Sequence, residues 1–525
     1  MKPTSRKFRQ AKWDEPIIME MSVPGERGIL LPGISQKIES IAGDVVSIIP
    51  EAIRRKVPPA LPEISQARVV RHFTHLSQET LGTDVSIDIG KGTCTMKYSP
   101  KVNEHLARLS EAADIHPLQD ESTIQGTLQI MYDFQEILKE ISGMDEFSLQ
   151  PGGGSQAIYT NACIIRAYHE QNGESQQRNE IITTVFSHPV NAACARTAGF
   201  KVITLYPGVD GYPDLDALRR VVSDRTAGMM ITNPEDSGIF NPKIQEFVDL
   251  VHEAGGICSY DQANANGILG ITRAREAGFD LCHFNLHKSF SSPHGSGGPG
   301  SGVIGATSRV AKYLPVPVVE FDGIDYRLNY DRPFSIGKIR EFHGCFQVVL
   351  RAYAWVMSMG AEGLREVAEI ATANNNYVLK KMKEIRGVEV PYDHKRRIEQ
   401  VRYSLEKMKR ETGVGTDDVR RRVTDFGTHY WTSHHPWVVA EPFTLEPTES
   451  YSTVELDEYV GILRKVSEEA YRDPNLVIDS PRNGIIQRVD ESSLDDPSRW
   501  AVTWRAHLRK NAEGRSGRQC KASSR

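Results

Sequence analysis

Short apolar runs alternate with helix-length amphipathic segments between residues 115 and 260. Apolar runs of about four to eight residues are typical of strands buried on both faces, and the segments between them can supply the crossovers that parallel strands need. The pattern predicts an α/β fold with a large, mostly parallel sheet that helices cover on both faces. The expected strands are 147–149, 181–185, 201–205, 228–232 and 256–260, and the expected helices are 128–141, 156–171, 191–199, 215–222 and 244–254.

The chain has 525 residues, which is long enough for more than one domain. Beyond the regular alternation the pattern changes, with Pro-rich connections and a terminal segment dense in Lys and Arg. In chain order we expect an N-terminal arm with a segment of the small domain (1–114), a large sheet domain (115–320), a smaller C-terminal α+β domain (321–492) and a disordered basic tail (493–525).

Three local expectations accompany this division. Residues 38–53 have the spacing of one amphipathic helix, and a long helical stretch is expected near 345–387. Residues 394–422 are dense in charge, which is typical of a solvated helix face.

Charge and composition argue against several classes of protein. Lys and Arg number 63 against 68 Asp and Glu, so the net charge of −5 offers no basic field for nucleic acid. No run approaches the roughly 20 apolar residues of a membrane span, and residues 1–12 lack the apolar core of a signal peptide. The seven cysteines include no CxxC pair, as expected for reduced thiols and not for a metal knuckle. We therefore expect a cytoplasmic protein without a metal site.

A lysine lies between small polar residues and glycines at the end of an apolar run. His287 and Lys288 fall in the stretch NLHKSFSSPH, which a glycine-rich run follows up to Gly302. A lysine whose ammonium is desolvated in such a setting has a lowered pKa and can form a Schiff base with an aldehyde cofactor. Most lysines are solvated charges, so this segment alone leaves both interpretations open.

An aspartate supports the first interpretation. Asp261 directly follows an apolar run, which places it where ligands bind in open α/β sheets, and Lys288 comes 27 residues later. A carboxylate there could hold the pyridinium N–H of pyridoxal phosphate and make the ring a better electron sink. The alternative is an aspartate that caps the next turn.

Two further features fall at predicted strand ends. The turn with Gly153, Gly154, Ser155 and Gln156 precedes a helix, and its free N–H groups suit a phosphate dianion. Its spacing is not that of a dinucleotide site, and it could equally be a tight connection. His188 follows another strand, so its ring could stack on a pyridine face, although a lone histidine is more often structural.

At these residues the sequence resembles the P-protein of the glycine cleavage system, specifically subunit 2 of its two-subunit form. The resemblance runs from Glu15 to about Asp490. The stretches that carry it are Thr93–Tyr98, 115–121, Gly143–Glu146, Thr232–Pro234, Asn285–Gly302, Tyr330–Pro333, Ser335–Gly337 and Glu446–Glu449.

The resemblance implies a pyridoxal-phosphate-dependent transferase fold of type I, with a large cofactor domain and a smaller C-terminal domain. By position, Lys288 is the Schiff-base lysine, Asp261 the partner of the pyridine nitrogen and His188 the stacking imidazole. The 153–156 turn belongs to the phosphate cradle, and Asn233 and His287 complete the predicted cofactor-binding set.

The family decarboxylates glycine and transfers the aminomethyl group to the lipoyl arm of H-protein, with subunit 1 as a partner. The resemblance therefore implies an amino-acid substrate, with glycine favoured, and a homodimer or heterotetramer.

Three departures from the family pattern lie beside the expected cofactor. Pro189 and Val190 stand where the family has Gly and Thr, Gln156 begins a stretch that lacks the family's His-Gly-Glu, and Gln262 replaces a glycine. They keep open a diverged pyridoxal-phosphate enzyme that acts on another amino acid without H-protein. A third hypothesis, a non-catalytic partner like subunit 1, gives no reason to retain Lys288 and Asp261.

Overall fold

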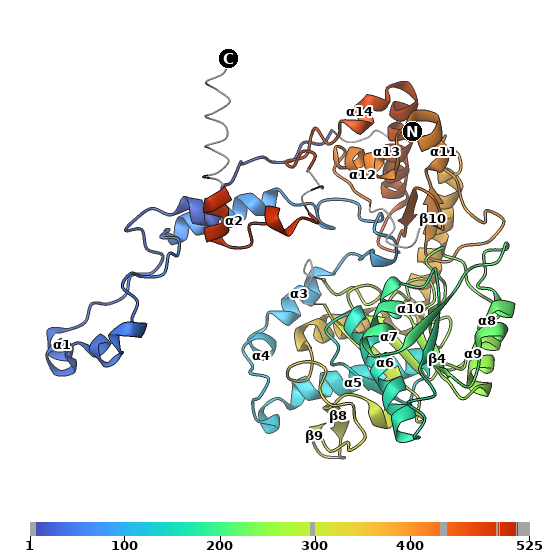
Figure 1. Cartoon of the computed structure of the whole chain (residues 1–525), viewed down its shortest axis with the longest axis horizontal. Helices are drawn as coiled ribbons and strands as arrows, with labels where there is room; N and C mark the ends of the chain where they lie inside the picture. The colour runs from blue at the N-terminus through green and yellow to red at the C-terminus, as the bar shows by residue number, and fades with distance from the viewer. Residues whose placement is uncertain are drawn as a thin grey trace. The chain divides into compact units, whose positions relative to one another are not determined.

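The structure is a computed structural model that describes residues 7–294, 300–430, 438–489, 492, 494–510 and 512 (Figure 1). The chain folds as two units, the first formed by Met1–Lys7 with Gly82–Ser480 and the second by Phe8–Leu81 with Pro481–Arg525. The finer division expected at residues 114, 320 and 492 stays a prediction.

A seven-stranded sheet forms the centre of the first unit. Its order is β1-β7-β6-β5-β4-β2-β3, in which β7 runs antiparallel to β1 and β6 and the other neighbours are parallel. This arrangement confirms the predicted α/β fold with a mostly parallel sheet. The strands are β1 (Glu146–Ser148), β2 (Glu180–Thr184), β3 (Lys201–Leu205), β4 (Thr226–Thr232), β5 (Ile257–Asp261), β6 (Leu281–Asn285) and β7 (Gly302–Ala306).

Helices cover both faces of this sheet. Successive side chains of β4 point to opposite faces, so Met229 packs in a core with Phe134 of α5 and Phe247 of α9, while Met230 packs with Ile158 of α6. The alternation of strand and helix predicted this two-faced core. The helices are α5 (Gln125–Ser142), α6 (Gly154–Gln171), α7 (Pro189–Thr197), α8 (Leu215–Val221) and α9 (Ile244–Glu253).

The rest of the first unit contains the predicted long helix, α10, which bends at Gly360, where φ is +65°. The C-terminal half of α10 packs with β10, β11 and α13 in a separate hydrophobic core that includes Val378, Tyr403 and Tyr459. The elements are η4 (Gly92–Cys94), α3 (Lys101–Ala107), α4 (Ser110–Ala113), η5 (Glu121–Thr123), η6 (Ala311–Tyr313), β8 (Val318–Phe321), β9 (Tyr326–Asn329), α10 (Phe346–Met382), β10 (Val401–Ser404), α11 (Glu406–Thr412), α12 (Thr416–Thr424), β11 (Pro442–Leu445), α13 (Thr453–Arg472) and α14 (Pro474–Ile478).

The prediction that 394–422 is a solvated helix face holds only for its second half, where Glu406, Lys409 and Arg410 of α11 are exposed, and is wrong for its first half. The stretch contains strand β10, and Arg397 and Arg402 within it are each only 2% exposed. The guanidinium of Arg397 donates to the carbonyls of Lys395 and Tyr392, and that of Arg402 pairs with Asp236. Charge density alone misses this outcome, because a buried arginine is tolerated wherever acceptors surround it.

The second unit consists of short helices with little buried surface. Its elements are η1 (Ile18–Met21), α1 (Gln36–Ala42), η2 (Val45–Ile48), η3 (Glu51–Ile53), α2 (Gln66–Gln78) and η8 (Pro497–Arg499). The predicted single helix over 38–53 is wrong, because Gly43, at φ +60°, and Pro50 interrupt it. Within the predicted disordered tail, 493–525, the structure describes residues 494–510 and 512, and Pro497–Arg499 and residues 504–510 are helical there. Residues 493, 511 and 513–525 lie outside the described residues.

Among the described residues, no helix is both long and apolar enough to cross a membrane.

Candidate active site

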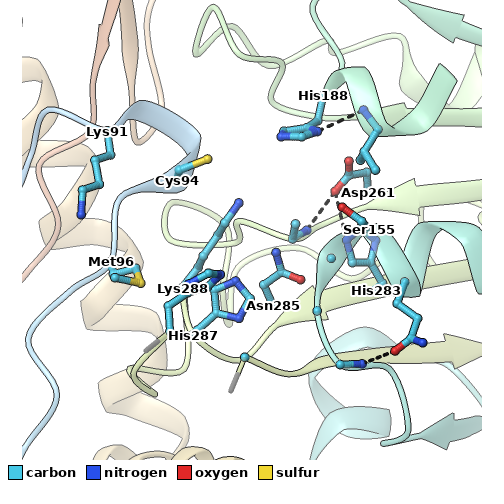
Figure 2. A pocket seen from close by; sticks show the side chains of 18 of the residues that line it. Lys91, Cys94, Met96, Ser155, His188, Asp261, His283, Asn285, His287 and Lys288 are labelled. Carbon is cyan, nitrogen blue, oxygen red and sulfur yellow. Dashed lines mark hydrogen bonds and ion pairs between the residues drawn. The ribbon is translucent and has the colours of Figure 1, made fainter. Parts of the chain in front are cut away.

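A cavity of about 940 Å³ opens in the first unit where β2, β5 and β6 end (Figure 2). Lys288 points into it, with His188 and Asp261 across from the lysine and Lys91, Cys94 and Met96 on another wall. The lining residues are Lys91, Cys94, Met96, 152–156, His188, Val190, Asp261, Ala263, His283, Asn285, His287, Lys288, His294, Gly300 and Arg340. Parallel strands end at one edge of a sheet, so residues far apart in sequence meet there.

Asp261 ends β5 and is only 3% exposed. Burial acts to raise the pKa of its carboxyl, but the imidazoles of His283 and His188 and hydrogen bonds from Asn191 and Ala263 outweigh burial and lower the pKa. The Nδ2 of Asn191 donates to Oδ2 over 2.8 Å, and the N–H of Ala263 donates to Oδ1 over 3.1 Å. The cavity therefore contains a fixed carboxylate that can accept a hydrogen bond from a protonated ring nitrogen.

Lys288 lies in the turn that follows β6 and is 6% exposed. The backbone N–H of Lys288 donates to the backbone carbonyl of Asn285 over 3.1 Å, and this hydrogen bond stabilises the turn. The Oγ of the adjacent Ser289 accepts the N–H of Ala265 over 2.7 Å, so the lysine turn is joined to the loop that follows Asp261. The turn that contains the Lys288 amine is thus hydrogen-bonded to the loop that directly follows the Asp261 carboxylate.

His287 neighbours the lysine and lines the same cavity. Burial, followed by the charge of Lys288 and the nearby His294, lowers the pKa of His287 to about 3. The imidazole is therefore neutral at ordinary pH, and its Nδ1 is buried without a hydrogen-bond partner among the described residues.

His188 caps the N-terminus of α7. Its Nδ1 accepts the N–H of Val190 over 3.2 Å, and Pro189 occupies the first helical position. This cap fixes the orientation of the ring at the cavity wall (Figure 2).

The glycine-rich turn leads directly into α6, whose 18 residues begin at Gly154 beside the cavity. A Cβ at Gly152 would lie 2.5 Å from Nη1 of Arg340, so the glycine allows the guanidinium to approach the turn closely. Oε1 of Gln156 accepts the N–H of Gly152, and its Nε2 donates to the carbonyl of Ile339, each over 2.6 Å. A helix N-terminus and an arginine next to it form a site suited to a phosphate.

The residues of the cavity fit pyridoxal phosphate. Lys288 supplies an amine, Asp261 an anion and the start of α6 a set of N–H donors, and Asn285 keeps a buried Oδ1 without a partner among the described residues. Of the predicted site residues, the structure brings together Gly153, Gly154, Ser155, Gln156, His188, Asp261, His287 and Lys288. Asn233 is not among the lining residues, because its side chain bonds to the backbone of Asn241.

Comparisons with known proteins give the family. Residues 367–485 match the family model of the glycine dehydrogenase C-terminal domain, and residues 153–299 match that of class-V aminotransferases. The chain is 48% identical to a protein of Pyrococcus abyssi named "Probable glycine dehydrogenase (decarboxylating) subunit 2" over 97% of its own length and 99% of the relative's. The chain belongs to this subunit 2 family. A member from Halalkalibacterium halodurans is 42% identical, over 91% of this chain and 96% of the relative.

Solved structures agree on the fold of this family member. A glycine decarboxylase (P-protein) of the glycine cleavage system, in inhibitor-bound form, matches with a TM-score of 0.67 at 19% identity, over 83% of this chain and all of that one. A cysteine desulfurase from Thermococcus onnurineus matches with a TM-score of 0.57 at 15% identity, over 74% and 98% of the two chains. The fold is that of pyridoxal-phosphate-dependent enzymes of fold type I.

Several lining or supporting residues were absent from the sequence-based set. Asn191 follows His188 by three residues, one helical turn, so helix spacing could have found it. His283 lies 3.4 Å from Oδ1 of Asp261 and two residues before Asn285, on the same face of β6, so strand alternation could have found it. Arg340 and Lys91 come from distant segments and carry no local signal.

One further group has the composition of a metal site. His252, Cys258 and Asp280 lie together, but Oδ2 of Asp280 is already 2.7 Å from Nε2 of His252 and accepts a hydrogen bond from the backbone N–H of Cys258 over 2.8 Å. The guanidinium of Arg309 lies 3.3 Å from its other oxygen. These contacts make the group an ion-pair network that joins α9 to the sheet.

Proposed function

We propose that the chain is the cofactor-binding subunit 2 of a glycine dehydrogenase (decarboxylating). It releases carbon dioxide from glycine and passes the remaining aminomethyl group to the lipoyl arm of H-protein. The observation that carries the proposal is that Lys288 and Asp261 line one buried cavity, in a chain whose near-complete length matches relatives of that name.

Pyridoxal phosphate, when bound, supplies a ring that accepts the electron pair left by a departing carboxylate. In this proposal the Lys288 amine anchors the cofactor aldehyde, and Asp261 keeps a proton on the ring nitrogen. His188 covers the ring face, while the 152–156 turn, the start of α6 and Arg340 hold the phosphate. The neutral His287 lies beside the lysine without adding a competing positive charge.

The proposed assembly includes subunit 1, in a heterotetramer, with a homodimer as the alternative. The second unit supports a partner, because thirteen large apolar residues between 29 and 61 are exposed. Exposed apolar surface of this extent marks an interaction site. We place the reaction in the cytoplasm, where the described cysteines, which form no disulfide, remain reduced.

The test is the visible absorption spectrum of the purified chain with pyridoxal phosphate, titrated with a panel of amino acids. The expected result is a lysine-bound cofactor band that Lys288→Ala abolishes. Carbon dioxide release from glycine is expected only once subunit 1 and H-protein are added. A band unchanged in Lys288→Ala would overturn the site, and turnover of another amino acid without partners would show a diverged enzyme.

A further inference from the structure

A buried cluster of charged residues contacts the segment Thr184–Ser187, which directly precedes His188. Glu235 and Asp236 follow β4 and are 2% and 4% exposed, and Arg402 of β10 is 2% exposed. The guanidinium of Arg402 pairs with the carboxylate of Asp236 and stands 5.4 Å from the ring centroid of Phe186. None of the three residues lines the cavity.

The two acidic residues each make one hydrogen bond to the residues just before His188. The N–H of Asp236 donates to the carbonyl of Phe186 over 3.1 Å. Oγ1 of Thr184 donates to Oε1 of Glu235 and lies 2.7 Å from Oγ of Ser187. Ser187 Oγ also accepts the N–H of Thr232 over 3.0 Å. Every residue from Thr184 to Ser187 except Val185 is therefore tied to the end of β4 or to the residues just after it.

The stretch just before β10 holds the acidic turn from its other side. Nε2 of Gln400 donates to the carbonyl of Glu235 over 3.2 Å, and the N–H of Ile398 donates to the carbonyl of Gly238 over 2.9 Å. Gly238 has φ +78°, and a Cβ there would lie 1.8 Å from the carbonyl oxygen of Gln400. The backbone of Gln400 thus approaches this position so closely that only glycine, which has no Cβ, can occupy it.

Stability alone does not explain such a cluster. Replacing a buried ion pair by apolar residues of similar size is often neutral or favourable, because removing charges from water is costly. We propose that Glu235, Asp236 and Arg402 are positioning residues that hold the His188 imidazole against the cofactor, acting through Thr184, Ser187 and Phe186. The inference rests on the proposed function, since it takes His188 as the residue that covers the ring.

Two adjacent threonines of β2 provide a matched test. Thr184→Val removes the hydroxyl that joins Glu235 to Ser187 at nearly constant shape. Thr183→Val is the control, since Oγ1 of Thr183 is buried without a hydrogen-bond partner among the described residues. We expect Thr184→Val to weaken pyridoxal phosphate binding by about tenfold, the effect of one lost buried hydrogen bond, and to change the circular dichroism of the bound cofactor. Thr183→Val should leave both unchanged.

A second pair separates positioning from general stability. Arg402→Met removes a buried arginine, and Arg422→Met removes one whose side chain is 11% exposed. Arg422 pairs with Glu469 and Asp425, and none of these three residues lines the cavity. We expect both variants to lower the melting temperature. Only Arg402→Met should weaken cofactor binding and alter the dichroism, and Arg402→Lys should restore part of both.

The outcomes distinguish this inference from the proposed function. A wild-type chain that binds no pyridoxal phosphate through Lys288 would overturn the proposed function. If the wild type binds it and Lys288→Ala abolishes the band, equal cofactor affinity and dichroism in Thr184→Val and Thr183→Val would overturn the positioning role alone.

Discussion

The two units of this chain differ in what their side chains pack against. The first contains extended hydrophobic cores, on both faces of the sheet and around α13, and its cavity walls are held by buried hydrogen bonds. In the second unit, Ile64 and His72 are the buried residues among those described. A segment that buries so little apolar surface does not offset the entropy of ordering its backbone. The structure of the site is therefore maintained by the first unit. Contacts within the second unit contribute little to its own stability.

Substituting core residues should show the largest difference between the units. Phe134→Ala in the sheet core, where the ring is fully buried, should lower the free energy of unfolding by about 3 to 5 kcal/mol. Ile41→Ala in the second unit, where the side chain is 77% exposed, should change it by less than about 0.5 kcal/mol. Denaturant unfolding of the isolated chain measures both, and similar losses would remove the contrast.

Charged pairs should follow the same contrast. Lys97 is fully buried and lies 2.9 Å from Oε1 of Glu449, so Lys97→Met, which leaves that carboxylate unpaired, should cost about 3 kcal/mol. The pair of Arg68 and Glu26 in the second unit is partly exposed, and Arg68→Met should cost less than about 1 kcal/mol. Unfolding curves for both variants test this, and an equal cost would contradict it.

The pH dependence of stability should be sensitive to Glu235. Burial raises the pKa of its carboxyl to about 7, although the hydrogen bond from Thr184 and the charge of Arg402 oppose the rise. An acid with a raised pKa binds its proton more tightly in the folded state, so stability falls as pH rises from its ordinary pKa through 7. Relative to Glu235→Gln, the wild type should lose about 1 to 3 kcal/mol of unfolding free energy between about pH 5 and pH 8. Parallel profiles would refute this assignment.

The smallest effect on the isolated chain is expected from a polar change in the exposed segment. Ile41→Asp should leave the melting temperature unchanged, because the side chain has no core to leave. It should weaken association with subunit 1, measured by size-exclusion chromatography with light scattering. Lys37→Asp, on the same helix α1, tests whether added negative charge alone has this effect. If Ile41→Asp associates with subunit 1 as well as the wild type does, the exposed apolar residues around Ile41 are not part of the proposed interface.

Much of the fold could be predicted from sequence patterns because the spacing of apolar residues within each segment indicates whether it forms a strand or a helix. Strands β2 to β5 and helices α5 to α9 have short-range periodicity, and their ends fell within a few residues of the expected positions. The predicted helix over 38–53 failed because Gly43 and Pro50 outweigh an apolar spacing that has no core to face. The roles assigned to Lys288, Asp261 and His188 stay predictions, although the structure places all three around one cavity.

The sequence by itself determined the alternation of strand and helix, and with it the edge of the sheet where Asp261, His188 and Lys288 meet. Their positions at strand ends are enough, because parallel strands end at a common edge. Only the tertiary structure decided that Arg340 approaches the glycine-rich turn, that Asn233 bonds to Asn241 and that Arg402 is buried against Asp236. These contacts are between residues that are far apart in the sequence. When the burial of a residue depends on such a distant partner, the hydrophobic pattern of the surrounding sequence does not indicate it.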